Sequence, residues 1–147
     1  MKTLWQEATR AECTARARRL TLGSEPQWGR MTVDQMLAHV VDAFRMGLGE
    51  IPVKSKRLVI RFWPINWLLA NLLTFPKNLP TVPEIVTRKK ASIEEELRQL
   101  DAAMTRFAAR KGSTSWPAHP ALGRLSGKSW ARLGYQHIDH HLRQFGV

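Results

Sequence analysis

The sequence predicts an all-α protein, and more closely a four-helix bundle that forms a single domain over residues 1–147. Apolar side chains make up 44% of the 147 residues, which is enough to fill the core of one domain of this length. Breaks rich in glycine and proline divide the chain into four segments of helical character, and none shows the alternating pattern of a strand. Helices without strands bury their apolar faces against one another in a bundle.

The first two helices precede residue 50. We expect the first over residues 4–20. The second has a clear start, because Thr32 can act as its N-cap and Gln35, three positions on, completes a capping box. It extends to about Leu48 and ends at Gly49, a residue that commonly terminates helices.

The last two helices carry similar start signals. The third begins near Ser92, where Glu95 forms a second capping box, and it extends to about Lys111. The fourth has Ser126 as its N-cap and ends near Gly146.

Residues 50–90 form a long connection between the second and third helices. Pro76, Pro80 and Pro83 exclude a continuous helix there. A connection of this length allows a crossover, so the second and third helices can run parallel to each other.

The same connection contains an apolar stretch, residues 58–75, that is long enough to suggest a transmembrane helix. Arg61, Asn66 and Asn71 interrupt it, and an arginine in mid-bilayer is costly. We therefore interpret the stretch as a buried or interface-forming segment, with attachment to a membrane surface as a weaker alternative. Because exposed apolar patches usually meet a partner, we expect a homodimer.

The chain is strongly basic, with a formal net charge of +11 and 23 lysines and arginines. This balance permits association with nucleic acid or acidic surfaces. The basic runs are spread along the chain, however, and are not interleaved with aromatic residues as in a base-stacking surface. We interpret them as a solvated face and do not expect nucleic acid as a partner.

The single cysteine, Cys13, cannot form an internal disulfide, which suits a reducing compartment. The N-terminal residues contain no apolar core of signal-peptide length. Together these observations favour a cytoplasmic location. No activating motif surrounds Cys13, so we interpret it as a packed thiol and not as a nucleophile.

Three of the five histidines, His137, His140 and His141, fall within five residues of the fourth helix. The spacing of His137 and His141 places both imidazoles on one helix face, about one turn apart. Neutral imidazole is a common metal ligand, so such a pair can bind one ion. The alternative interpretation is a solvated, polar helix end.

Helical periodicity directs this pair toward the interior. At about 100° per residue, His141 falls inside the apolar arc of its helix, His137 at the edge and His140 on the shoulder. His39 on the second helix lies close to that helix's apolar arc, where a lone histidine is more typical of a hydrogen-bonded boundary residue. Three histidines from two facing helices leave a coordination position open, as in catalytic metal sites.

Two motifs are similar to those of the DinB-like (YfiT-like) superfamily of metal-dependent four-helix bundles. They are WGRMTVDQMLAH, residues 28–39, and QHIDHHLRQ, residues 136–144, and the second resembles the superfamily pattern NHxxHHRGQ. The resemblance covers nearly the whole chain and places it in a separate branch of the superfamily. It implies one DinB-like domain of up-down-down-up topology, in which His39, His137 and His141 bind a metal.

The resemblance also implies a class of function. Relatives in the superfamily include thiol-dependent S-transferases and isomerases. The resemblance therefore implies a divalent metal, with zinc and nickel as the first candidates. It also implies a transferase or hydrolase that acts on a small molecule through a metal-bound thiol or water. Gln136 stands where the pattern has Asn, and Leu142-Arg143 where it has Arg-Gly, so the substrate stays open. The alternative is a non-enzymatic bundle that acts through dimerisation or partner binding without a functional metal.

Five further side chains are candidates for the surroundings of the site. Arg45, Lys77 and Arg143 can hold an acidic substrate, although each is also typical of an ordinary surface. His140 is a candidate neighbour of the ligands. His119 lies in a loop between prolines and can transfer protons at the mouth of the site, with a structural role in a turn as the alternative.

Overall fold

A computed structural model of the chain describes residues 1–54, 59–71, 77 and 91–147. This part of the chain contains α-helices and no β-strand, so the predicted all-α class is confirmed. The helices are α1 (Glu7–Ala17), α2 (Val33–Leu48), α3 (Ile65–Asn71), α4 (Ile93–Ala109) and α5 (Gly127–Gln144), with a short 3-10 helix, η1 (Val59–Arg61), before α3. Pro76, Pro80 and Pro83 of the long connection lie outside the described residues.

The predicted caps lie at the ends of the three longest helices. The Thr32 N–H donates to Gln35 Oε1 at 3.0 Å, and α2 ends at Gly49, whose φ of +83° is the left-handed conformation that glycine readily adopts. The hydroxyls of Ser92 and Ser126 accept from backbone N–H groups three positions on, at 3.3 and 3.1 Å. Local polar groups therefore determine these boundaries.

The first helix is shorter at both ends than the predicted residues 4–20. The N–H groups of Arg19 and Leu20 bond to carbonyls three positions back, so the chain leaves α1 through tight turns. Leu4 is fully buried even though it precedes the helix, and its N–H donates to the Ala131 carbonyl on α5. The apolar pattern thus identified buried residues of this region but extended the helix too far.

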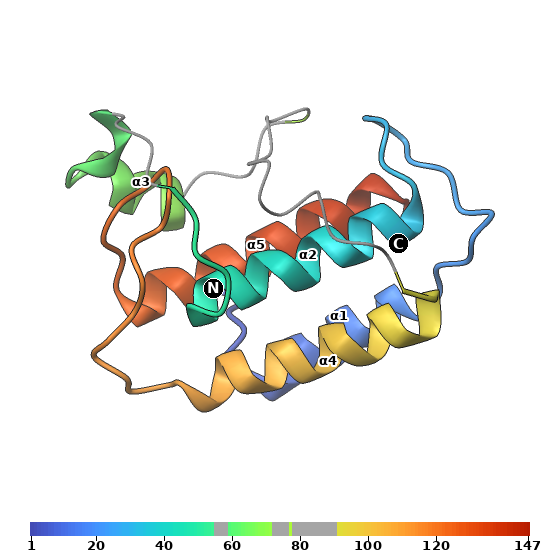
Figure 1. Cartoon of the computed structure of the whole chain (residues 1–147), viewed down its shortest axis with the longest axis horizontal. Coiled ribbons are helices and arrows are strands. Elements are labelled where there is room, and N and C mark those ends of the chain that lie inside the picture. Colours follow the sequence, from blue (N-terminus) through green and yellow to red (C-terminus); the bar gives the residue numbers. More distant parts are fainter. Residues whose placement is uncertain (55–58, 72–76, 78–90) are drawn as a thin grey trace.

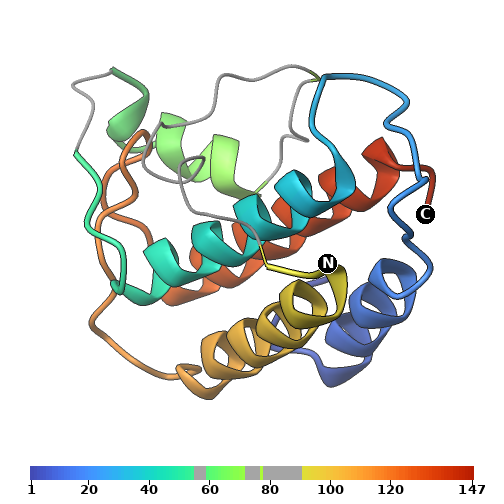
Figure 2. The ribbon, with the colours of Figure 1, turned by 45° about the vertical axis from the view of Figure 1, so that its right-hand side comes forward.

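The long helices pack side by side around a shared core, as two views of the ribbon show (Figure 1; Figure 2). α2 packs chiefly against α4 and also against α5, while α1 packs against α4 and α5. A Cβ at Gly134 of α5 would lie 3.1 Å from Phe44 of α2 and 2.7 Å from Leu4, so glycine permits this close approach. Cys13 is fully buried, and burial raises its pKa to about 11, as expected of a packed thiol.

The apolar stretch over residues 58–75 is described from Val59 to Asn71, where it forms η1 and α3. α3 packs on α5, but the side chains of Phe62, Trp63 and Trp67 are exposed. Burial was therefore the wrong expectation for these three side chains, and the interface-forming alternative stays a prediction. Among the described helices, none has the length and apolar character needed to cross a bilayer.

Candidate metal centre

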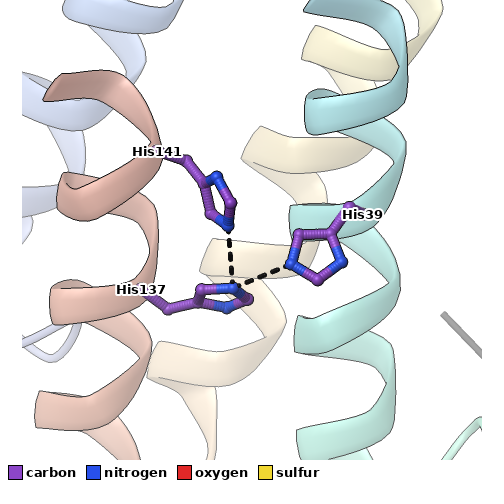
Figure 3. A group of neighbouring side chains, drawn as sticks. All are labelled: His39, His137 and His141. Atoms are coloured by element: carbon purple, nitrogen blue, oxygen red, sulfur yellow. Dashed lines mark hydrogen bonds between the residues drawn. The ribbon is translucent and has the colours of Figure 1, made fainter. Parts of the chain in front are cut away.

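Three histidines from two helices bring their Nε2 atoms together. His39 Nε2 on α2 lies 3.0 Å from His137 Nε2 on α5, which in turn lies 3.1 Å from His141 Nε2. The ring centroids of each pair are 4.9 Å apart. Figure 3 shows the imidazoles pointing toward one another between the two helices. The structure thus brings together the three histidines that we predicted as metal ligands.

Helix geometry accounts for this convergence. His137 and His141 are four residues apart on α5 and project from one face. His39 meets them because α2 packs against α5. His39 and His141 are only 5% and 7% exposed, and His137 is half-buried, so the cluster is largely withdrawn from water.

Burial keeps the imidazoles of His137 and His141 uncharged at neutral pH. Loss of solvation, with His141 and His39 adding smaller effects, lowers the pKa of His137 well below its ordinary value of 6.5. Burial, assisted by the neighbouring His39, lowers the pKa of His141 to about 3. A neutral imidazole offers a nitrogen lone pair and is the form that binds metal.

Gln144 determines which nitrogen of His141 carries the proton. Its Nε2 donates to the Trp28 carbonyl at 2.7 Å, and because a carbonyl only accepts, this contact assigns the orientation of the amide. The Gln144 Oε1 therefore faces His141 Nδ1 at 2.8 Å and accepts its N–H. The His141 Nε2 that faces His137 is then left with its lone pair, as a ligand atom must be.

The donor set fits a single divalent cation. A proton on His137 Nε2 can point along only one of the two short contacts, to His39 or to His141, whereas a cation accepts lone pairs from all three nitrogens at once. Tetrahedral ligands at ordinary Zn–N lengths lie about 3.3 Å apart, close to the two separations observed here. Among the residues that the structure describes, the cluster contains no fourth protein ligand, so three imidazoles leave a coordination position for another molecule.

A prediction follows for Gln144. Replacing it with methionine, Gln144→Met, keeps the volume but removes the hydrogen bond that orients His141, so we expect metal affinity to fall about 10- to 100-fold. Competition with a chromophoric chelator measures this change. The matched control is Gln136→Met on the same helix, since Gln136 Oε1 has no hydrogen-bond partner in the described part of the chain. Equal losses in both variants would contradict the orienting role.

The two other predicted histidines lie outside the cluster. His140 is buried against the edge of Trp28, with ring centroids 5.7 Å apart, and its ring lies 5.2 Å from that of His141. His119 lies in the turn before α5, where its Nδ1 accepts from the N–H groups of Ala121 and Leu122. The structure therefore gives His140 a place beside the ligands and His119 a place in a hydrogen-bonded turn.

The three cations proposed for an acidic substrate differ in their surroundings. Arg45 bonds to the carboxylates of Asp42 and Glu50, each at 3.3 Å, and Arg143 lies 3.0 Å from Asp139. Lys77 Nζ instead lies over the ring of Trp28, 4.5 Å from its centroid. The ring of Trp28 also packs against that of His140, which adjoins His141, so Lys77 is connected to the histidine cluster through adjoining rings.

Sequence reasoning included Trp28 and Gln144 in its motifs but gave neither a role. A signal for Gln144 was present, since a residue three positions after His141 shares its helix face. The contribution of Trp28 is a backbone carbonyl from the loop before α2, which carries no side-chain signal.

Comparison with known proteins places the chain in a family. It matches the family model described as "Protein of unknown function (DUF1569)" over residues 3–146, nearly its whole length. No curated protein and no solved structure matches it. The chain therefore belongs to the DUF1569 family, whose description leaves the function open.

Proposed function

We propose that this protein binds one divalent metal ion, zinc or nickel first, through His39, His137 and His141. The observation that carries the proposal is the convergence of three Nε2 atoms, in which those of His39 and His141 lie 3.0 and 3.1 Å from that of His137. Two further observations support it. The imidazoles of His137 and His141 are uncharged and therefore have a lone pair to donate, and the Nδ1–H···Oε1 bond from His141 to Gln144 leaves the His141 Nε2 lone pair directed toward the cluster.

The open position next to the triad supports an enzymatic role, that of a transferase or hydrolase acting on a small molecule. A divalent metal held there would lower the pKa of a bound thiol or water and so supply a nucleophile at neutral pH. The chain contributes orientation through Gln144, partial exclusion of water through burial, and positive charge through Lys77. Cytoplasmic location belongs to the same proposal.

The proposal includes a topology, that of an up-down-down-up four-helix bundle of the DinB-like superfamily. In Figure 1, α2 and α4 run in the same direction, and α1 and α5 run in the opposite one. This arrangement supports the crossover that the long connection between α2 and α4 led us to expect. Two motifs, residues 28–39 and 136–144, carry the resemblance.

A metal titration tests the proposal. Protein purified without a histidine tag and stripped of metal should bind one equivalent of zinc or nickel, measured by calorimetry and elemental analysis. His39→Ala should bind at least about 100-fold more weakly, because it removes one of three protein ligands. Failure of the wild-type protein to retain either ion would contradict the metal proposal. It would favour the alternative, in which the histidines form a hydrogen-bonded polar cluster.

A further inference from the structure

The segment of η1 and α3 exposes most of its large apolar side chains, while α3 buries its two asparagines. Eight large apolar side chains are exposed in the described part of the chain, and six of them lie between residues 59 and 68. We call these six the α3 apolar face; they are Val59, Phe62, Trp63, Ile65, Trp67 and Leu68. Trp63 is 79% and Phe62 70% exposed, whereas Asn66 and Asn71 are both buried. This distribution is the reverse of that in an ordinary surface helix.

The buried asparagines hold α3 in this orientation. Asn66 Nδ2 lies 3.0 to 3.2 Å from the carbonyls of Arg61, Leu122 and Arg124, the last two in the turn before α5. Asn71 Nδ2 donates to Ser129 Oγ on α5 at 3.1 Å. Turning the apolar face inward would leave these buried acceptors without donors. The hydrogen bonds of Asn66 and Asn71 therefore keep the apolar face exposed.

Charge distinguishes which partner suits this face. Residues 51–83 contain five lysines and arginines and no aspartate or glutamate, and residues 102–138 contain six and none. These two ranges supply both α3 and the turn to which Asn66 is bonded. With a net charge of +11, two copies of the chain would repel each other, whereas an anionic surface would attract the chain.

We propose that the α3 apolar face binds the surface of a bilayer that contains anionic lipids. Tryptophan and phenylalanine are well suited to the boundary between headgroups and acyl chains. Basic residues around an apolar face add electrostatic attraction to anionic headgroups. This inference does not depend on the metal site, because α3 supplies none of the three histidines.

Flotation of the full chain with lipid vesicles tests the proposal. At physiological salt we expect binding to phosphatidylcholine vesicles that contain phosphatidylglycerol, and much weaker binding to phosphatidylcholine alone. The double variant Phe62→Ser, Trp67→Ser removes two exposed side chains of the face, and we expect its partition onto anionic vesicles to be at least tenfold weaker, roughly the effect of removing two apolar groups.

The matched control is Leu22→Ser. Leu22 is 80% exposed in the connection between α1 and α2, which lies at the opposite end of the molecule from α3 in Figure 1. This variant should bind like the wild type. Circular dichroism checks that all three proteins are folded, and sedimentation velocity on the same samples reports self-association.

Three results would overturn the proposal. The first is absence of binding to anionic vesicles, and the second is binding that the double variant retains in full, which would indicate adsorption by charge alone. The third is a wild type that forms a dimer and does not bind vesicles, together with a double variant that is monomeric. This result would assign the face to a second copy of the chain.

Discussion

His137→Ala is expected to remove the stabilisation that a divalent metal gives to the folded chain. For the wild type, free metal at 1,000 times its dissociation constant should add about 4 kcal/mol to the free energy of unfolding. For a chain of this size that corresponds to a rise in Tm of roughly 10 °C. His137 lies within 3.1 Å of both other ligands, so its loss should abolish the rise. Thermal unfolding with and without zinc or nickel measures the difference.

His140→Ala is the matched control on the same helix. His140 packs against Trp28 and His141 but is not one of the three converging nitrogens, so its truncation can lower the Tm of the metal-free protein. The rise in Tm that metal produces in this variant should nevertheless match the rise in the wild type. An unchanged rise in His137→Ala, or its loss in His140→Ala alone, would show that the ligand set is wrong.

His119 and His141 together are expected to cost the metal-free protein about 4 kcal/mol of folding free energy between pH 7 and pH 5. Burial, with Arg61 as a smaller effect, lowers the pKa of His119 to about 4, and burial lowers that of His141 to about 3. Both folded-state pKa values lie below the unfolded value of 6.5, so the unfolded chain binds more protons. Stability is therefore full above pH 6.5 and falls below it, by about 2 kcal/mol per histidine at pH 5.

His119→Asn separates the two contributions. An asparagine Oδ1 can accept from the N–H groups of Ala121 and Leu122 as His119 Nδ1 does, but it does not titrate. Denaturant unfolding from pH 7 to pH 5 should show a loss about 2 kcal/mol smaller in this variant than in the wild type. If the variant loses as much stability as the wild type, His119 does not contribute to acid sensitivity.

The parts of the fold that sequence could predict were those specified by local side chains. Thr32, Ser92 and Ser126 mark the starts of three helices because each lies at the N-cap position of its helix. The orientation of α3 was not predictable in this way. Its apolar composition suggested burial, whereas two of the three acceptors that hold Asn66 belong to a turn more than 50 residues later in the chain.

The candidate ligands were accessible to sequence reasoning for a related reason. The four-residue spacing of His137 and His141 and the position of His39 near an apolar arc depend only on helix periodicity. Their hydrogen-bonded surroundings depend on tertiary structure. The bond between Gln144 and the Trp28 carbonyl joins residues 116 positions apart, and no local pattern predicts it.

The division of the ligands between α2 and α5 has a topological consequence. An ion held by the triad would cross-link His39 to His137, which are 98 positions apart, and would close a loop that contains the whole of α4. Separation of α2 from α5 would then require release of the ion, whereas α1 contributes no ligand and is free to open on its own. Amide protons of α2 and α5 should therefore be the ones whose exchange slows when metal is added.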